Sequence, residues 1–414
     1  MLKNFKDIYQ DYPRDFWVLA GSMFIDRIGT AFVFPFLALF ITTRFNVSMT
    51  RVGETLAIYF GGAFLGNMIG GAIADKFGRK VILITGLILS AFSSLAMGLV
   101  KDWDIFVQLV VVAGVCSELG TPAVQAMIAD ILPIEKRIDG LGILRVVINL
   151  AVTIGPAIGG ILAGVDFLLL FLGDVIISTT TAIIVYVALP ETKPALEDGK
   201  VEETIAQSLG GYWRVLTNKI FMAIIFLSML TAIVYMQMNT TLSVFLRDIH
   251  GVPAQYYGYL LSINAAAVVL FQFFVTRRVK RFHPLLVLMA GNLFFALGFG
   301  LFGFTRHYWQ FIILMMVITM GRMLYGPVIQ ALIAQIAPRN LRGRYMAVFH
   351  TVWVLAAGIA PWAAGAVLDN YNPNWIWYAC GIISVFVSLG YWLLKKRFGK
   401  RYILHGKARE QNMA

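Results

Sequence analysis

Charged residues and cysteines are scarce in this chain of 414 residues. Only 14% of the residues are charged and 59% are hydrophobic, with a mean hydropathy of +0.77. This composition argues against a soluble globular domain. The two cysteines, Cys116 and Cys380, lie in apolar segments without further ligands at metal-binding spacing. The sequence therefore predicts neither a disulfide framework nor a metal site.

Signatures of enzymes and of nucleotide binding are also missing. The chain contains no Gly-x4-Gly-Lys-(Ser/Thr) loop, which would cradle the phosphates of ATP. The first 15 residues are polar and contain no short apolar core with a cleavage site, so we expect no removable signal peptide. The sequence predicts a protein that is not an enzyme and that needs no cofactor.

Long apolar runs dominate what is present. A spanning helix needs about 20 mainly apolar residues, and the sequence offers roughly twelve such windows, which predicts an all-α integral membrane protein with 12 transmembrane helices. The windows are 16–43, 51–74, 80–100, 104–132, 139–163, 167–189, 219–246, 256–276, 284–304, 308–336, 342–368 and 374–397.

The positive charges lie mainly on one side of these windows. The net charge is +12, and most of the 34 Lys and Arg residues fall in the two tails and in every second loop. Positive loops stay in the cytoplasm, so we expect both termini to be cytoplasmic. The same distribution predicts a lipid bilayer, and not nucleic acid, as the partner of the basic residues.

The sequence repeats itself at a constant offset of 205 residues. Gly53 falls on Gly258, Pro122 on Pro327 and Gly160 on Gly365, all without a gap. Because internal repeats report architecture directly, we predict two pseudo-symmetric six-helix bundles. Their bounds are 1–189 and 219–414, the second with a basic cytoplasmic tail, and a polar cytoplasmic linker, 190–218, joins them. Paired six-helix bundles are typical of secondary transporters with a site near mid-membrane.

Two motifs then indicate a family. "GAIADKFGRK", from Gly71 to Lys80, resembles the signature loop of the major facilitator superfamily, and "GILRVVINLAVTIGPAIGG", from Gly142 to Gly160, is similar to the fifth-helix motif of its 12-helix drug:proton antiporter branch. Ala151 replaces one glycine of the second motif. "PETK" at 190–193 resembles the usual exit from the sixth helix. In place of an arginine that antiporters of this branch carry in the fourth helix, this chain has Val110.

Charged residues inside the predicted helices are candidates for coupling, because an intramembrane charge faces a cavity or pairs with another group. In the first helix, Asp26 either faces a cavity as a protonatable group or pairs with a neighbouring helix while Arg27 extends toward the cytoplasm. In the fourth helix, Glu118 either exchanges a proton or pairs permanently with Arg145 or Arg27. Gln125 lies on the same helical face as Glu118.

Further polar residues extend this candidate site for substrate and proton coupling. Arg145 and Arg322 stay charged, so they would tune a carboxyl group or hold an anion. At the repeat offset, Arg145 falls on His350 and Arg322 falls beside Glu118. His350 can titrate near neutrality, or it is a buried histidine with a structural hydrogen bond. Phe32, Phe34, Tyr235, Met236 and Met238 are candidates for the lining of a cavity.

The signature loop and the fifth-helix motif receive separate roles. The resemblance implies that Asp130 meets Arg79 in a cytoplasmic gate with Asp75, and a static surface ion pair is the alternative. The gate comprises Gly71, Asp75, Lys76, Gly78, Arg79, Lys80 and Asp130. The helix-packing motif comprises Gly142, Gly155, Pro156, Gly159 and Gly160, which let another helix approach closely, and we expect that helix to be the eighth.

These patterns favour a secondary active transporter that works by alternating access. The resemblance implies proton-coupled efflux, or antiport, of small hydrophobic or cationic compounds such as drugs. The alternative is a transporter of the same fold for a metabolite, sugar or lipid-like organic anion held by intramembrane arginines. We expect a monomer with both termini in the cytoplasm, in the plasma membrane of a prokaryote.

Overall fold

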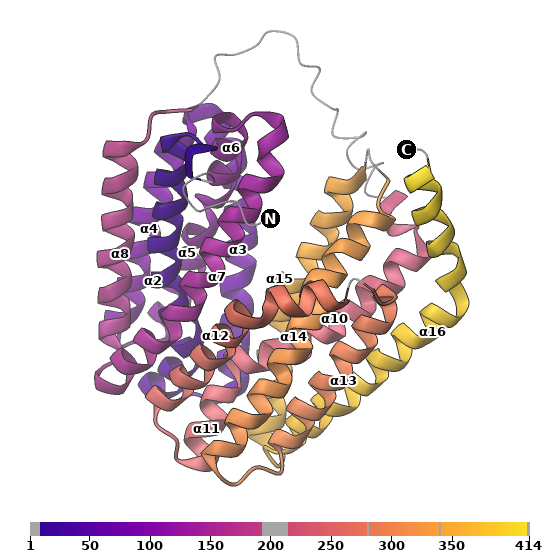
Figure 1. Ribbon diagram of the computed structural model, residues 1–414. Helices are drawn as coiled ribbons and strands as arrows, with labels where there is room; N and C mark the ends of the chain where they lie inside the picture. Colours follow the sequence, from indigo (N-terminus) through magenta and orange to yellow (C-terminus); the bar gives the residue numbers. More distant parts are fainter. Residues whose placement is uncertain (1–8, 193–213, 280, 339–340, 412–414) are drawn as a thin grey trace. The chain divides into compact units, whose positions relative to one another are not determined.

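The computed structural model describes residues 9–192, 214–279, 281–338 and 341–411, and the regular structure in this part of the chain is helical (Figure 1). Twelve helical segments there are long and apolar enough to cross a membrane, as the sequence predicts. The helices are α2 (Arg14–Phe45), α3 (Met49–Phe77), α4 (Arg79–Leu99), α5 (Trp103–Glu118), α6 (Thr121–Ile131), α7 (Ile134–Val165), α8 (Leu168–Ala188), α10 (Lys219–Thr240), α11 (Leu242–His250), α12 (Ala254–Val279), α13 (Pro284–Phe302), α14 (Tyr308–Ile336), α15 (Arg342–Asn370) and α16 (Trp375–Gln411).

The predicted helix 104–132 is not continuous. It breaks at Leu119 and Gly120, so that Glu118 ends α5 and Pro122 stands in the first turn of α6. Proline has no N–H to donate to the carbonyl four residues earlier, which here belongs to Glu118. The two helices still form one span, Trp103–Ile131, and Glu118 therefore lies in the middle of a span at a helix terminus.

The predicted helix 219–246 also ends early. α10 stops at Thr240, and the short helix α11 follows with a buried apolar face formed by Leu242, Val244, Phe245 and Leu246. Gly251 ends α11 in the left-handed conformation, with φ of 63°, which glycine adopts without a steric penalty. α11 is too short to span a bilayer.

The chain packs into two compact units. The first unit comprises Met1–Val201, Gln237–Val269 and Ala357–Asp369, and the second comprises Glu202–Met236, Leu270–Ala356 and Asn370–Ala414. Parts of α10, α12 and α15 therefore belong to each unit. The division into bundles 1–189 and 219–414 stays a prediction from the repeat, and residues 193–213 of the predicted linker lie outside the described residues.

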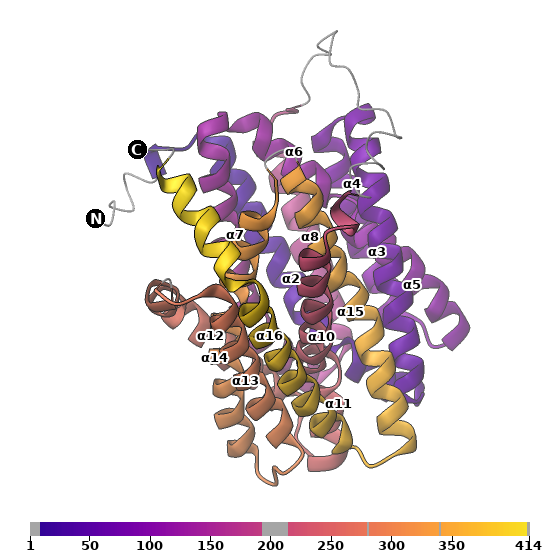
Figure 2. The same ribbon diagram turned by 90° about the vertical axis from the view of Figure 1, so that its right-hand side faces the viewer.

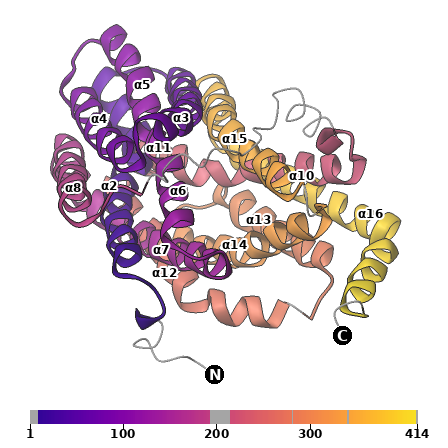
Figure 3. The same ribbon diagram turned by 90° about the horizontal axis from the view of Figure 1, so that it is seen from above.

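Within the first unit, α2 is a central helix. It packs against α7 and α8, while α4 packs against α8 and α5 (Figures 1 and 3). Phe16, Met23, Met127, Leu132 and Val185 are buried together in one apolar cluster. Lipid tails are as apolar as these side chains, so close van der Waals packing, and not release of water, holds the helices together.

Within the second unit, α13 packs against both α14 and α16 (Figure 2). The Phe302 ring meets Trp377 edge-on at 5.2 Å between centroids, and Phe299 stacks on the same indole at 6.4 Å. The buried Thr231 hydroxyl donates to Asn292 Oδ1 at 2.9 Å. Aromatic packing thus holds α13 against α16, and the hydrogen bond between Thr231 and Asn292 holds α10 against α13.

Glycines of the fifth-helix motif contact two different helices. Gly160 packs against α12, whereas Cβ atoms built on Gly155 and Gly159 would lie only 2.4 Å from Ala31 Cβ and 2.6 Å from Phe32 Cβ of α2. The eighth predicted helix corresponds to α12. The expectation that it is the partner of the motif is therefore confirmed for Gly160 and wrong for Gly155 and Gly159. Phe32 is buried beneath this glycine surface, at 2% exposure, so it belongs to the core and does not line a cavity.

A second glycine crossing joins α3 to the C-terminal end of α15 within the first unit. A Cβ atom on Gly53 would lie 2.3 Å from the Trp362 Cα atom, and one on Gly365 would lie 2.4 Å from the Met49 carbonyl carbon. The Asp369 carboxylate accepts hydrogen bonds from the backbone N–H groups of Met49 and Thr50, at 2.9 and 2.8 Å. Asp369 therefore caps the first turn of α3 from another helix.

Candidate functional site

Three carboxylate side chains gather inside the membrane-spanning part of the first unit. Asp26 comes from α2, Glu118 from the end of α5, and Asp174 from α8. The charge of Glu118 acts on Asp26, and the charge of Asp26 acts on Asp174. Arg27 is the cation among them, with its Nε 3.9 Å from Asp26 Oδ2. One arginine among three carboxylates leaves the group acidic when the carboxylates are ionised.

Helix packing explains how Asp174 reaches this cluster. Its Oδ1 atom lies against α2 at Gly29, where an added Cβ would stand only 2.7 Å away. Ser94 of α4 hydrogen-bonds to Asp174, and Ser178, one turn further along α8, hydrogen-bonds to Asp26. Asp174 is 7% exposed. The absence of a side chain at Gly29 therefore opens the space that brings two carboxylates from different helices together.

Polar neighbours complete the cluster. The Tyr59 hydroxyl of α3 hydrogen-bonds to Ser117 and lies within electrostatic reach of Glu118 and Asp174. Arg27 Nη2 donates to Thr121 Oγ1 of α6 at 3.5 Å. The adjacent residues Asp26 and Arg27 approach each other at the outer limit of an ion pair, and Arg27 also has a partner on another helix.

Asp174 was missed by the sequence analysis. It is the acidic residue in the apolar run 168–188, "LLLFLGDVIISTTTAIIVYVA". The argument from intramembrane charge that selected Asp26 and Glu118 selects Asp174 equally. Serines at 94 and 178 carry no such signal, because serine is common in spanning helices.

Two other predicted residues of the first bundle are exposed. Arg145 is exposed on α7 and is not one of the charges that act on Asp26. Gln125 is exposed on α6. The structure therefore brings together Asp26, Arg27 and Glu118, and the pairing of Arg145 with Glu118 stays a prediction.

Arg322 has an aromatic environment in the second unit. Its guanidinium carbon lies 4.6 Å from the ring centroid of Tyr235 and 5.2 Å from that of Trp353. The two rings meet edge-on at 6.0 Å. The charge of Arg322 is thus compensated by aromatic quadrupoles. His350 is exposed on α15, with its ring 6.2 Å from the ring of Phe349, so it is not a buried histidine.

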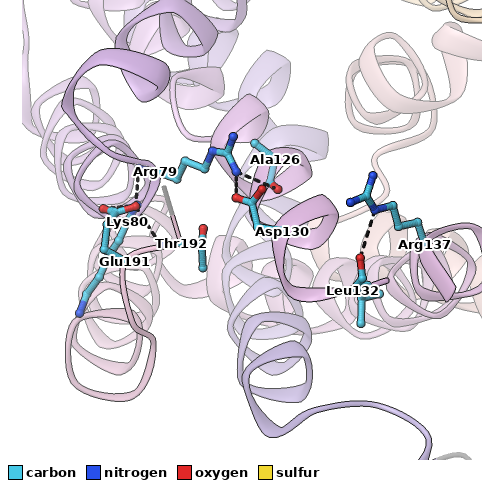
Figure 4. A network of polar contacts seen from close by, with 8 residues as sticks. All are labelled: Arg79, Lys80, Ala126, Asp130, Leu132, Arg137, Glu191 and Thr192. Atoms are coloured by element: carbon cyan, nitrogen blue, oxygen red, sulfur yellow. Dashed lines mark hydrogen bonds and ion pairs between the residues drawn. The ribbon is translucent and has the colours of Figure 1, made fainter. Parts of the chain in front are cut away.

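The predicted gate contains the expected ion pair. Arg79 Nη1, at the beginning of α4, pairs with Asp130 Oδ2 of α6, and it also donates to the Ala126 carbonyl at 3.4 Å (Figure 4). The side chain of Asp75 lies outside the described part of the structure. Gly78 adopts φ of 107° between α3 and α4, a conformation that side chains other than glycine rarely adopt.

Glu191, from the "PETK" motif, contributes to the same region. Its Oε1 accepts from the backbone N–H of Arg79 at 2.9 Å, and its Oε2 accepts from that of Lys80 at 3.2 Å (Figure 4). Lys80 Nζ donates to the Tyr186 carbonyl at 2.7 Å. A carboxylate at a helix N-terminus satisfies unpaired N–H groups and the helix dipole. The exit of α8 is therefore fastened to the beginning of α4.

Of the remaining motif residues, Gly71 and Gly142 have room around them. A Cβ on Gly71 would meet Pro122 Cβ at 3.7 Å, and one on Gly142 would meet nothing within 4 Å. Lys76 is exposed, with Nζ 5.3 Å from the centroid of the neighbouring Phe77 ring. Across the described residues, no group of three or more His, Cys, Asp or Glu side chains is arranged to hold a metal ion.

Known proteins resemble this chain over nearly its whole length. It is 27% identical over 428 residues to the Na(+), Li(+), K(+)/H(+) antiporter of Planococcus maritimus, covering 96% of this chain and 97% of the relative. It is 24% identical over 407 residues to the quinolone resistance protein NorA of Staphylococcus aureus (strain COL), covering 97% and 100%. A crystal structure of a peptide transporter POT mutant in complex with sulfate matches with a TM-score of 0.77 at 15% identity, covering 94% and 95%.

The family assignment rests on the sequence. A model of the Major Facilitator Superfamily matches residues 19–282 and 238–411, which together include all twelve spans except the first residues of α2. The fold and the family are those of transporters and not of enzymes. The chain belongs to the major facilitator superfamily, and it resembles the drug:proton antiporters of that family.

Proposed function

We propose that this transporter exports small hydrophobic or cationic compounds in exchange for protons, by alternating access. The observation that carries the proposal is the cluster of Asp26, Glu118 and Asp174 inside the span-forming part of the first unit. Ionisable side chains inside a membrane span are costly, and in transporters such carboxyl groups form proton relays. One arginine cannot neutralise three of them, so a proton or a cationic substrate would be attracted there.

The direction and the chemistry are supported by the relatives. One is named for quinolone resistance and another for exchange of monovalent cations against protons. An acidic cluster suits the transport of protons and cations that these names indicate better than it suits the binding of an anion. Arg27 lies beside Asp26, and Arg322 lies between two aromatic rings. We therefore rank transport of a metabolite, sugar or organic anion on intramembrane arginines below proton-coupled efflux.

Exchange of Na⁺, Li⁺ or K⁺ for protons is the second candidate. The relative from Planococcus maritimus supports it at 27% identity. A monovalent metal cation that has shed its water needs several oxygen ligands, whereas a proton needs one carboxylate. Backbone carbonyl and hydroxyl oxygens can supply such ligands, so a transport measurement has to distinguish the two ions.

Membrane orientation completes the proposal. Both termini and the gate of Arg79 and Asp130 would lie in the cytoplasm, because the basic loops lie on that side. The ion pair would hold α4 to α6 in one state and break in another. We place the protein in the plasma membrane of a prokaryote, as a monomer.

Transport in inverted membrane vesicles tests the function. Vesicles with the wild type should take up a fluorescent cationic dye when a proton gradient is imposed, and dye addition should release protons. Asp26→Asn, Glu118→Gln and Asp174→Asn each remove one titratable group with little change in shape. We expect at least one to abolish proton release, with a loss of about 10²-fold or more in coupled dye uptake.

Asp166→Asn is the matched control, because Asp166 is an exposed carboxylate in the loop between α7 and α8. It should transport like the wild type. Unchanged coupled transport in all three cluster variants would refute the assignment of the cluster. Sodium-driven or potassium-driven proton release without any dye transport would select the second candidate.

A further inference from the structure

The C-terminal half of the chain contains hardly any acidic residues. From Ile249 through Leu368 the sequence has no Asp and no Glu. Four basic residues nevertheless follow the apolar part of α12 within five positions, as "RRVKR" at 277–281. The acidic residues nearest to them in the sequence are Asp248 and Asp369.

Three of these bases share a pocket in the second unit. A surface pocket of about 520 Å³ is lined by Phe274, Val275, Arg277, Arg278 and Arg281. All three arginines are exposed. Within the described residues none of them forms an ion pair with a carboxylate. Lys280 lies outside the described residues.

The pocket surface is mainly apolar, and its three arginines favour a phosphate group. Guanidinium groups bind phosphate through paired N–H donors in a fixed planar fork, and several arginines in one pocket can share its oxygens. The C-terminal end of α12 carries the negative end of the helix dipole. The helix dipole therefore stabilises the positive charges of the arginines and does not attract an anion. The arginine side chains alone would provide the affinity for the anion.

The location of the pocket favours a lipid as the source of that phosphate. α12 crosses the membrane from Ala254 to Val279, so the arginines of its last turn stand at the level of lipid headgroups. Phe271, Phe273 and Phe274 in the preceding turn are 50%, 65% and 67% exposed. Exposed rings beside the arginines offer an apolar surface to acyl chains, which free phosphate would not use.

We propose that the pocket of Arg277, Arg278 and Arg281 binds the headgroup phosphate of an anionic glycerophospholipid, with Phe274 against its acyl chain. Basic pockets at the ends of spanning helices bind anionic lipids by this combination of charge and apolar contact. The proposal concerns a lipid site on the transporter and is independent of the transported compound.

Lipid titration of the delipidated, full-length protein in a neutral detergent tests the proposal. Phosphatidylglycerol binding is measured by native mass spectrometry, with phosphatidylcholine as the uncharged comparison. We expect Arg277→Gln with Arg278→Gln to weaken phosphatidylglycerol binding by about tenfold or more, equivalent to about 1.4 kcal/mol. Phe274→Ala should weaken it by a smaller factor.

Lys395→Gln with Lys396→Gln is the matched control, because it removes the same charge near the end of the last span, Trp375–Arg397. It should leave the affinity within about twofold of the wild type. An equal loss in both charge variants would mean general surface attraction and would overturn the proposal. Displacement of the lipid by millimolar inorganic phosphate would assign the pocket to free phosphate and would also overturn it.

A conservative pair covers the case in which the glutamine variant does not fold. Arg277→Lys with Arg278→Lys keeps the charge and the positive-inside signal, but it replaces two planar forks by point charges. We expect a weaker affinity, between those of the wild type and the glutamine variant. Wild-type affinity in this lysine variant would show that the arginine fork is not needed and would contradict the proposed recognition.

Discussion

Gly160 of α7 and Gly258 of α12 face each other so closely that a Cβ atom added to Gly160 would lie 2.9 Å from the Gly258 Cα atom. The neighbouring atoms are backbone, which cannot rotate away as a side chain can. The crossing joins helices from the two sequence repeats, and both residues lie in the first unit. Close approach of two helices thus depends on both positions having no side chain.

Gly160→Val should therefore separate α7 from α12. Overpacking of a tight contact costs about 1–3 kcal/mol, so we expect a lower thermal unfolding midpoint in detergent and slower transport. Gly142→Val is the control from the same motif, because nothing lies within 4 Å of a Cβ atom at Gly142. Equal losses in both variants would contradict a specific role for the crossing.

Asp369→Ala should loosen the beginning of α3. The substitution removes the acceptor for the N–H groups of Met49 and Thr50, and loss of a helix cap costs about 0.5–2 kcal/mol. We expect faster hydrogen exchange in the first turn of α3. Asp248→Ala, which removes an exposed carboxylate paired with Arg247, should leave that exchange unchanged. Unchanged exchange in Asp369→Ala would argue against the cap.

Arg79→Gln and Asp130→Asn should slow turnover with little change in apparent substrate affinity. Each variant removes one partner of the same ion pair, so the double variant should be about as slow as either single one. Contacting charges in one network couple by about 0.5–3 kcal/mol. Rates measured in vesicles for all four proteins give this coupling directly. Independent, additive effects would reduce the pair to a static surface contact.

Asp75→Asn extends the same experiment to the residue whose side chain is not described. We expect slower turnover at unchanged affinity, as for the ion pair, because the family resemblance assigns Asp75 to the same gate. Lys76 is exposed beside it, and Lys76→Gln should have a smaller effect. A large loss of affinity in Asp75→Asn at normal turnover would remove it from the gate.

Arg322→Met should destabilise the second unit more than Arg322→Lys does. The guanidinium lies over both Tyr235 and Trp353, and cation–π contacts contribute about 0.5–2 kcal/mol. Thermal unfolding in detergent, with the exposed Arg306→Met as control, measures the difference. Loss of affinity for an organic anion at unchanged stability would instead support the alternative function.

The span count and the Arg79–Asp130 pair were predictable from sequence. Apolar length reports a spanning helix whatever surrounds it, and the family resemblance implied that Asp130 meets the arginine of the signature loop. The interruption at Leu119 and Gly120 was not predicted, because hydropathy is insensitive to one missing N–H. Pro122 was the available signal, since proline disrupts the hydrogen bond to the residue four positions earlier.

The cluster around Asp26 was only half predictable. Asp26 and Glu118 stand out as charges in apolar runs, and Asp174 could have been found in the same way. That Asp174 lies against Gly29 depends on which faces of α2 and α8 meet, and a weakly amphipathic spanning helix does not reveal this. For the same reason the sequence does not reveal that α7 presents Arg145 on an exposed face.

The contact of Glu191 with the beginning of α4 has a consequence for limited proteolysis. The Glu191 carboxylate, just after α8, accepts hydrogen bonds from the N–H groups at the beginning of α4. The two ends of the segment from α4 to α8 are therefore joined by noncovalent contacts. A protease that cuts after Thr192 would leave these hydrogen bonds intact. The end of α8 would therefore stay bound to α4 in the nicked protein, and the new chain terminus would not unravel the helix behind it.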